Sequence, residues 1–405
     1  MAEHSIMKRE QTTTTKAEKE EAAASIHGDI LESVLTHVPL IDLVPASHVS
    51  KSWKRAVSTS LRHFNKIKPW LLLHSQATRS PYSTTAYAFD PRSCLWLQIR
   101  RPPIKHISPL RSSHSTLLYM LSSSKFSFSV DPLHLTWHHV DAPVVWRTDP
   151  IVAVVGHRVI VAGGACDFED DPLAVEMYDL KTRTWDTCES LPAHFKDSAA
   201  SMWLSVAVRS NKMYVVEKST GVTYWFNPET KSWYGPYSLR PQRNVYSSAI
   251  GFADDRLILI CLIGDDHGEE VTSVKLWELN DASFKFCKEI GEMPEQLIEK
   301  LRGDTFSISS AIINVMGDFV YISNTSAPEE VIFCEFGSGP CRWSSVRNAV
   351  VNDHRRLTER LVFTCANVGM SALQRAINAE DTQFAVLGSR GEHSVGSVQN
   401  RTEPK

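Results

Sequence analysis

The 405-residue sequence predicts a small all-α module followed by an all-β propeller of six blades. A tryptophan recurs at near-constant intervals through most of the chain, each time after apolar runs of strand length, and this pattern predicts the propeller. Apolar residues at helical spacing within residues 25–66 predict the preceding module.

The repeat is an apolar, strand-like run that ends in Asp or Asn, with a tryptophan six residues after that polar residue. Four clear copies end at Trp96, Trp137, Trp185 and Trp233. In a fifth copy we assign the two positions to Glu278 and Phe284, and a sixth copy, with two extra residues, ends at Trp343. The intervals average about 49 residues, close to the length of one blade in propellers with a roughly 50-residue repeat.

Each copy has the pattern of a β-hairpin. Asp90-Pro91, Asp131-Pro132 and Asn227-Pro228 combine a side-chain acceptor with the fixed φ of proline, which favours a type I turn. A second apolar strand precedes each hairpin, and one more short strand precedes four of these. Because one such sheet cannot bury both of its faces, we expect each tryptophan to pack between neighbouring blades.

These segments resemble the kelch-repeat propeller family over about residues 67–370, including one diglycine, Gly163-Gly164, after a second strand. The first blade lacks an inner strand, and one strand-like run, residues 360–368, follows the last repeat. Since a closed ring leaves no long unpaired edge, we expect this run to complete the first blade. Residues 371–387 are expected to form a short C-terminal extension, and residues 1–24 and 388–405 to be disordered tails.

Three short helices are expected in the module. Asp29 and Glu32 suggest a capping-box-like start for the first helix, and Pro39 should end it. Asp42 can cap a second helix with Pro45 in its first turn, and Ser50 can cap a third. About forty residues are too few for a self-sufficient core, so the apolar face of the module implies a partner.

The order of these apolar residues resembles the F-box, although Ile26-His27 stand where that family has Leu-Pro. F-boxes bind a Skp-family adaptor, which joins them to a cullin and a RING protein in an E3 ubiquitin ligase. The resemblance implies that the adaptor-binding residues are Ile30, Leu31, Val34, Leu35, Val38, Pro39, Leu43, Val49, Ser50 and Trp53.

An F-box followed by kelch repeats resembles the plant F-box/kelch-repeat proteins. The resemblance implies a non-catalytic substrate receptor of a Skp-cullin-F-box ligase, without a cofactor, that directs a target protein to ubiquitination and proteasomal degradation. Several plant members target enzymes of phenylpropanoid or flavonoid synthesis such as chalcone synthase, and such an enzyme is the expected target. The alternatives are a kelch scaffold without a ligase role and a kelch-type copper oxidase, which needs Tyr, His and Cys ligands that the loops do not show.

Composition narrows the function classes further. A net charge of −3 gives no reason to expect nucleic-acid or membrane binding. The chain shows neither a signal-peptide core nor a membrane-spanning apolar run, so we expect it in the cytoplasm, the nucleus or both. The eight cysteines form no C-x-x-C pair and are expected to be reduced. The acidic runs 167–171 and 265–270 lack EF-hand spacing, so no metal site is expected.

Strand alternation suggests where a target protein binds. In an up-and-down blade, the loop between the second and third strands lies on the same face as the crossover to the next blade, and these are the longer loops of this chain. Trp and Arg dominate binding hot spots. The candidate target-binding residues on this face are Arg79, Arg101, Lys105, Trp146, Arg147, Arg240 and Arg243.

Overall fold

The computed structural model describes residues 28–63, 68–80, 82–102, 108–164, 171–265, 270–280, 283–337, 339–350 and 358–387. The chain divides into two compact units, Met1–Lys66 and Ile67–Lys405, and each is described by itself. The expected tails 1–24 and 388–405, and the Ile26-His27 pair, lie outside the described residues.

The first unit contains three helices, α1 (Asp29–Leu35), α2 (Leu40–Ala46) and α3 (Lys51–His63). Ser50 caps α3 as expected, because its Oγ accepts a 3.2 Å hydrogen bond from the Trp53 amide. The capping box expected for α1 is absent. Gly28, with a φ of 66°, occupies the N-cap without a side-chain bond, so Asp29 and Glu32 both lie in the first turn, where a carboxylate favours the helix dipole.

The start of α2 also differs from the expectation. Pro39, in an extended conformation, is the N-cap residue, and its carbonyl accepts the amides of Asp42 and Leu43 at 3.0 and 3.1 Å. Asp42 therefore lies in the first turn rather than at the cap. Pro45 lies inside the helix near its end, not in its first turn.

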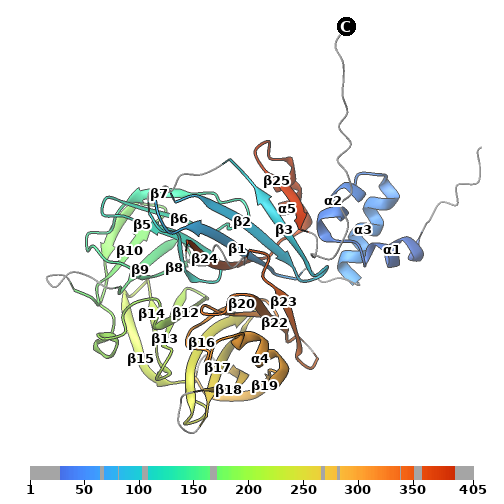
Figure 1. Ribbon diagram of the computed structural model, residues 1–405. Coiled ribbons are helices and arrows are strands. Elements are labelled where there is room, and N and C mark those ends of the chain that lie inside the picture. Colours follow the sequence, from blue (N-terminus) through green and yellow to red (C-terminus); the bar gives the residue numbers. More distant parts are fainter. Residues whose placement is uncertain are drawn as a thin grey trace, which may run out of the picture. The chain divides into compact units, whose positions relative to one another are not determined.

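The second unit contains six antiparallel sheets, five of four strands and one of five, in the part of the chain that the structure describes (Figure 1). From the inner to the outer strand, blade 1 consists of β24 (Glu359–Ala366), β1 (Trp70–Ala77), β2 (Thr84–Asp90), β3 (Leu95–Arg100) and β25 (Gln383–Leu387). Blade 2 consists of β4 (Arg111–His114), β5 (Leu117–Leu121), β6 (Lys125–Ser129) and β7 (His138–Asp141). Blade 3 consists of β8 (Ile151–Val155), β9 (Arg158–Ala162), β10 (Val175–Asp179) and β11 (Thr184–Thr187).

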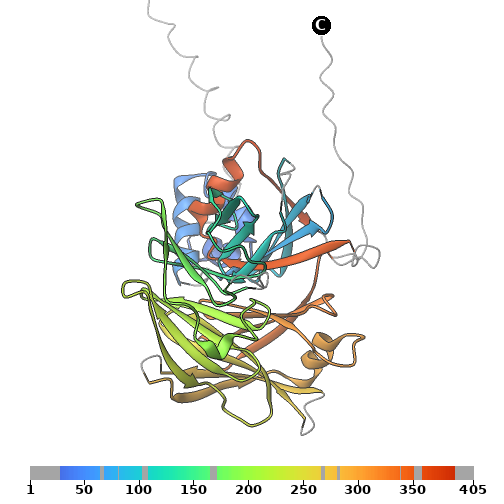
Figure 2. The same cartoon turned by 90° about the vertical axis from the view of Figure 1, so that its left-hand side faces the viewer.

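The remaining blades have the same strand order. Blade 4 consists of β12 (Leu204–Arg209), β13 (Lys212–Glu217), β14 (Val222–Asn227) and β15 (Ser232–Ser238). Blade 5 consists of β16 (Val245–Ala253), β17 (Arg256–Gly264), β18 (Val271–Leu279) and β19 (Phe286–Glu292). Blade 6 consists of β20 (Ala311–Met316), β21 (Phe319–Asn324), β22 (Glu330–Glu335) and β23 (Arg342–Arg347). The 3-10 helix η1 (Ala193–Phe195) lies in the crossover to blade 4, and α4 (Glu295–Arg302), the orange helix in Figure 2, packs against β18, β21 and β22.

The ring closes through the C-terminal strand expected for this role. β24 pairs antiparallel with β1, with Cys365 opposite Leu71, and it also contacts β20 and β4, the inner strands of the two neighbouring blades. Residues 371–387, expected to form a short C-terminal extension, add a helix and a fifth strand to blade 1. α5 (Met370–Asn378) buries Leu373 and Ala376, and β25 pairs with β3, with Phe384 opposite Ile99. The partner of β25 is far away in the sequence, so no local pattern indicates the pairing.

The polar residue of each repeat shapes the turn after the third strand. Asp179 Oδ1 accepts the Lys181 and Thr182 amides at 2.7 and 3.1 Å, and the Arg183 amide donates to the Asp179 carbonyl at 2.8 Å. Arg183, four residues after the aspartate, has a φ of 62°. Positive φ values recur at the same position in other copies, at Cys94, Leu135 and Lys231. The repeat thus encodes a five-residue turn rather than a type I turn alone. A backbone hydrogen bond from the fifth amide to the first carbonyl closes this turn.

This turn geometry corrects the register of the fifth copy. Phe284 has a φ of 54°, and its amide donates to the Asn280 carbonyl at 2.7 Å. Asn280, not Glu278, therefore occupies the Asp position, and Phe286 occupies the tryptophan position, paired across the hairpin with Leu279. The assignment of Glu278 and Phe284 was wrong by two residues because it followed the acidic charge and not the turn.

The tryptophans join neighbouring blades, as expected. Trp185 of blade 3 donates a 3.0 Å hydrogen bond from its indole Nε1 to the carbonyl of Asp141 in blade 2. Its ring lies 5.3 Å from that of Tyr178 and 5.9 Å from that of Phe126, measured between centroids. Trp96, Trp185 and Trp233 thus each combine aromatic packing with one directional bond across a blade boundary.

Candidate functional site

Part of the expected adaptor-binding set forms the core of the helical unit instead. Leu31 and Leu35 are 2% exposed and Leu43 is fully buried. Helices α1 and α2 both pack on α3, so these leucines are covered by the unit itself. Their assignment as adaptor contacts is therefore corrected: they support the surface that a partner could touch, but they are not part of it.

Three other apolar side chains of the helical unit face solvent. Ile30, Val34 and Val49 are 68%, 50% and 63% exposed. Ile30 and Val34 are four residues apart on α1 and so lie on one helix face. We call these three residues the exposed apolar patch. Three exposed β-branched residues in so small a unit are typical of an interaction surface.

The other expected adaptor contacts are partly or fully exposed. Val38, Pro39 and Trp53 are half-buried, and Ser50 is exposed. The Ser50 hydroxyl is already engaged, since it caps α3. These four residues stay predictions as adaptor contacts.

In the propeller, the face that carries the crossovers and the loops after each second strand is here called the crossover face. Arg79, Arg240 and Arg243 are exposed there, and Trp146 is half-buried. The Arg240 guanidinium donates to the carbonyls of Arg243 and Val245 at 2.7 and 3.1 Å, so it also shapes its own loop. Lys105 lies outside the described residues.

Arg101 is largely engaged in internal contacts. Its side chain is half-buried and donates to Thr382 Oγ1 at 3.3 Å and to the Leu133 carbonyl. Burial lowers the pKa of Arg101, and the charges of Asp381 and Asp131 oppose this effect. Arg101 therefore helps to attach the segment after α5 to the propeller, and a role in target binding stays a prediction.

Arg147 is not a surface residue, and its assignment to the target-binding set is wrong. It is 1% exposed, and its guanidinium forms a buried ion pair with Glu176 and donates to the Ala174 carbonyl. The other side of the Glu176 carboxylate accepts the amides of Val144 and Val145 at 2.7 and 3.2 Å. The pair is thus fully hydrogen-bonded and fixes the crossover between blades 2 and 3.

Sequence reasoning missed most of the exposed apolar side chains on or next to the crossovers. These residues are Val144, Met202, Trp203, Tyr246 and Phe306, of which Phe306 is 100% and Val144 88% exposed. One signal could have found Trp203: it follows Trp185 by far less than one blade, so it does not fit the structural repeat. A tryptophan outside the repeat has no expected place between blades and is a candidate for binding.

Met202 and Trp203 lie beside a group of charged side chains at the crossover ends of the inner strands. Asp149 Oδ1 lies 2.5 Å from Arg111 Nη1 and accepts a 2.8 Å hydrogen bond from Ser201 Oγ. Lys218 Nζ donates to the Met202 carbonyl at 2.8 Å, and the Lys218 amide donates to the Trp203 carbonyl at 2.9 Å. Residues from three blades thus meet at this point.

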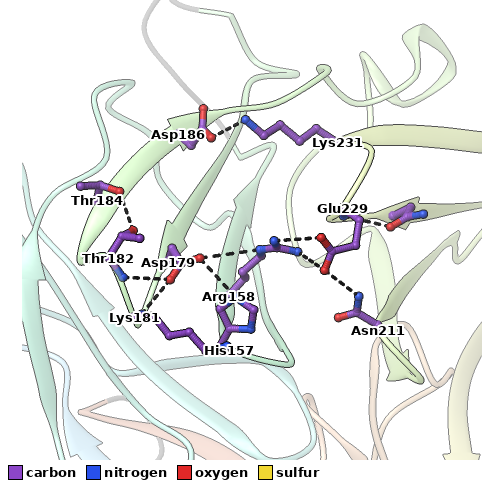
Figure 3. Close-up of polar contacts among 11 residues, drawn as sticks. His157, Arg158, Asp179, Lys181, Thr182, Thr184, Asp186, Asn211, Glu229 and Lys231 are labelled. Carbon is purple, nitrogen blue, oxygen red and sulfur yellow. Dashed lines mark hydrogen bonds and ion pairs between the residues drawn. The ribbon is translucent and has the colours of Figure 1, made fainter.

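The opposite face carries a second ionic network, between blades 3 and 4 (Figure 3). Arg158 Nη1 lies 2.7 Å from Glu229 Oε1, and His157 Nε2 lies 3.3 Å from Asp179 Oδ2. The hydrogen bond to Glu229 raises the pKa of Arg158, and the same bond lowers the pKa of Glu229. Asn211 of blade 4 also donates to Glu229, at 3.2 Å. All these charges are paired with one another, so the network joins two blades and leaves little charge for a ligand.

Two further observations concern metal binding and membrane spanning. Among the described residues, no group of three or more His, Cys, Asp or Glu side chains could hold a metal ion. No helix among them is long and apolar enough to span a membrane.

Comparison with known proteins agrees with this organisation. A family model described as F-box domain matches residues 28–65. F-box/kelch-repeat protein At1g23390 of Arabidopsis thaliana is 46% identical over 370 residues, which cover 88% of this chain and 93% of that protein. A second F-box/kelch-repeat protein of that plant, At3g24610, is 32% identical over 97 residues, 24% of this chain and 22% of that protein. The solved structure of YjhT covers 52% of this chain and 67% of its own, at 12% identity and a TM-score of 0.36.

A helical docking module and a six-bladed propeller together define a class of two-domain interaction proteins. Within that class, the chain belongs to the F-box/kelch-repeat family. Members of this family are in general non-catalytic substrate adaptors, and an F-box domain implies a Skp-type adaptor and a target protein as partners.

Proposed function

We propose that the chain is the substrate-recognition subunit of a Skp-cullin-F-box ubiquitin ligase. In this role the helical unit binds a Skp-family adaptor, which is linked to a cullin and a RING protein, and the propeller binds the protein to be ubiquitinated. The chain itself performs no chemistry, because ubiquitin transfer takes place on its partners. Such a subunit would work in the cytoplasm, the nucleus or both.

The exposed apolar patch is the observation that carries the proposal. The exposed side chains of Ile30, Val34 and Val49 contribute nothing to the core of the helical unit, whose own leucines are already buried. Burying such side chains against a partner is worth about 1.5 to 3 kcal/mol for each fully covered residue. An adaptor with a complementary apolar groove would supply that cover.

The target is proposed from the family resemblance. An enzyme of phenylpropanoid or flavonoid synthesis, such as chalcone synthase, is the expected target class. The crossover face supports a protein target of some kind, because it exposes the aromatic side chains of Trp203, Tyr246 and Phe306.

Co-purification tests the adaptor half of the proposal. The full chain is expressed with a Skp-family adaptor as wild type, as Val34→Asp and as Leu35→Ala. Val34→Asp should leave the helical unit folded and abolish adaptor binding, because it places an unpaired charge in the interface. Leu35→Ala is the matched core control and should lower the stability of the unit without removing an exposed contact.

Binding of purified chalcone synthase to the full chain tests the target half. Capture that Trp203→Ala weakens, while adaptor binding stays at the wild-type level, would support the crossover face as the recognition surface. Adaptor binding by Val34→Asp at wild-type strength would show that the exposed apolar patch is not the contact. Absence of adaptor binding by the wild-type chain would favour the alternative, a kelch scaffold without a ligase role.

A further inference from the structure

The crossover end of the propeller's inner strands carries more positive than negative charge. Arg111 is the first residue of β4 and Arg360 the second residue of β24, and these two inner strands contact each other. Lys218 follows β13 directly, and Asp149 lies in the crossover that leads to β8. We call these four residues the inner cationic cluster.

The carboxylate of Asp149 interacts electrostatically with all three cations of this cluster. Asp149 forms an ion pair with Arg111 and is the only charge that raises the pKa of Lys218. Burial nevertheless lowers the pKa of Lys218 to about 8, so the ammonium is still the main form at neutral pH. Three positive charges against one negative charge leave an excess of positive charge at this place.

Arg360 is the least compensated member. Burial lowers its pKa, and so does the positive charge of Arg111, whereas Asp149, Tyr82 and Tyr119 oppose the shift. Within the described residues its guanidinium makes no hydrogen bond or ion pair. Asp149 is the one carboxylate among the groups that raise the pKa of Arg360, and the neighbouring Glu359 lies on the other face of the strand, where it accepts a hydrogen bond from Ser75 on β1. A half-buried guanidinium beside a second guanidinium is a favourable position for an anionic group.

An exposed apolar surface adjoins the cluster. Met202 and Trp203 are 61% and 50% exposed, and their backbone carbonyls accept hydrogen bonds from Lys218. Ser201, the residue before them, donates to Asp149. The same short segment therefore touches the charged cluster with its backbone and presents apolar side chains to solvent.

We propose that the target protein binds here through a segment in which an Asp or Glu stands next to a large apolar residue. The carboxylate binds Arg360 and Arg111, and the apolar side chain packs on Met202 and Trp203. This inference rests on the proposed role of the propeller as the target-binding unit. A carboxylate fits the cluster because Arg111 is already paired with Asp149, which leaves the guanidinium of Arg360 as the main planar donor for one planar acceptor group.

The test uses the purified full chain, whose adaptor binding is measured in parallel, and a random peptide library displayed on phage. Wild type should enrich peptides that contain an Asp or Glu beside Leu, Phe or another large apolar residue. Arg360→Gln should lose the acidic preference and keep the apolar one. Lys181→Gln, an exposed lysine on the opposite face, is the charge-matched control and should select like wild type.

A double-mutant cycle with one selected peptide then measures the contact directly. Replacing the peptide Glu by Gln should weaken binding to wild type about tenfold or more, the effect of losing one charge-assisted hydrogen bond, and should change little with Arg360→Gln. A peptide with phosphoserine in place of Glu should bind more weakly than the Glu peptide. Tighter binding of the phosphoserine peptide would overturn the choice of a carboxylate.

Other outcomes separate this inference from the proposed ligase role. No enriched peptides, or peptides without an acidic excess, would overturn the inference, while adaptor binding by the same preparation would leave the ligase role standing. Loss of adaptor binding together with normal peptide selection would contradict the ligase role alone.

Discussion

The indole Nε1 of Trp96 donates a 3.0 Å hydrogen bond to the carbonyl of Arg347, which joins the first blade to the last. The Trp96 ring lies 5.3 Å from that of Phe89, and the Phe89 ring lies 5.5 Å from that of Phe333 in blade 6, measured between centroids. The boundary at which the ring closes is thus built like the boundaries between blades 2 and 3 and between blades 3 and 4. β24 then adds a covalent connection, because it follows blade 6 in the chain and pairs into blade 1.

Two tryptophans should separate stability from recognition. Trp185→Ala removes a ring between blades 2 and 3 together with its bond to Asp141, so we expect the free energy of unfolding to fall by about 3 kcal/mol. Trp203→Ala removes a half-exposed side chain and should change the free energy of unfolding by at most about 0.5 kcal/mol. Denaturant unfolding of both variants measures these values. A large loss of stability in Trp203→Ala would show that this residue supports the fold rather than a binding surface.

Truncations test the C-terminal closure in steps. A chain that ends at residue 357 lacks β24 and β25 and should aggregate, because the inner edge of β1 and the outer edge of β3 are then unpaired. A chain that ends at residue 369 keeps β24 but lacks α5 and β25, and should be soluble with a lower melting temperature. Removal of residues 390–405 should leave the melting temperature unchanged. Thermal melting with light scattering distinguishes the three, and a soluble, cooperatively melting chain ending at residue 357 would show that β24 is dispensable.

A histidine should make the propeller sensitive to acid. Burial lowers the pKa of His114 to about 4, whereas an unfolded histidine has a pKa near 6.5. The unfolded chain therefore binds more protons between these values, so this residue's contribution to stability is complete above about pH 6.5 and is lost as the pH falls toward 4. We expect His114→Asn to show a flatter fall in unfolding free energy than wild type from pH 6.5 to 5. Parallel curves for the two proteins would exclude His114 as the cause.

Local patterns made much of the propeller predictable, and non-local contacts account for what was missed. The Asp of each repeat caps its own turn and the tryptophan follows at a fixed distance, so both signals lie within a few residues. By contrast, the ion pair of Arg147 depends on Glu176, on another strand. Nothing in the crossover sequence alone indicates that this arginine is buried.

The helical unit shows a similar limit of sequence reasoning. Ile30 with Val34 and Leu31 with Leu35 are two neighbouring apolar pairs at the same spacing, and one periodic stripe includes both. The packing of α1 on α3 decides which pair is buried. This packing is a tertiary contact, which the periodicity of α1 alone does not contain. The sequence therefore indicated an amphipathic helix correctly, but not which of its apolar residues face outward.

Reconstituted ubiquitination tests the central claim most directly. The full chain, a Skp-family adaptor, a cullin, a RING protein and chalcone synthase are combined with the ubiquitin-activating and ubiquitin-conjugating enzymes, and ubiquitin on chalcone synthase is measured over time. We expect modification with wild type, none with Val34→Asp, and strongly reduced modification with Trp203→Ala although that variant still binds the adaptor. Equal modification of chalcone synthase with wild type and Val34→Asp would contradict the claim that the exposed apolar patch connects this protein to the ligase.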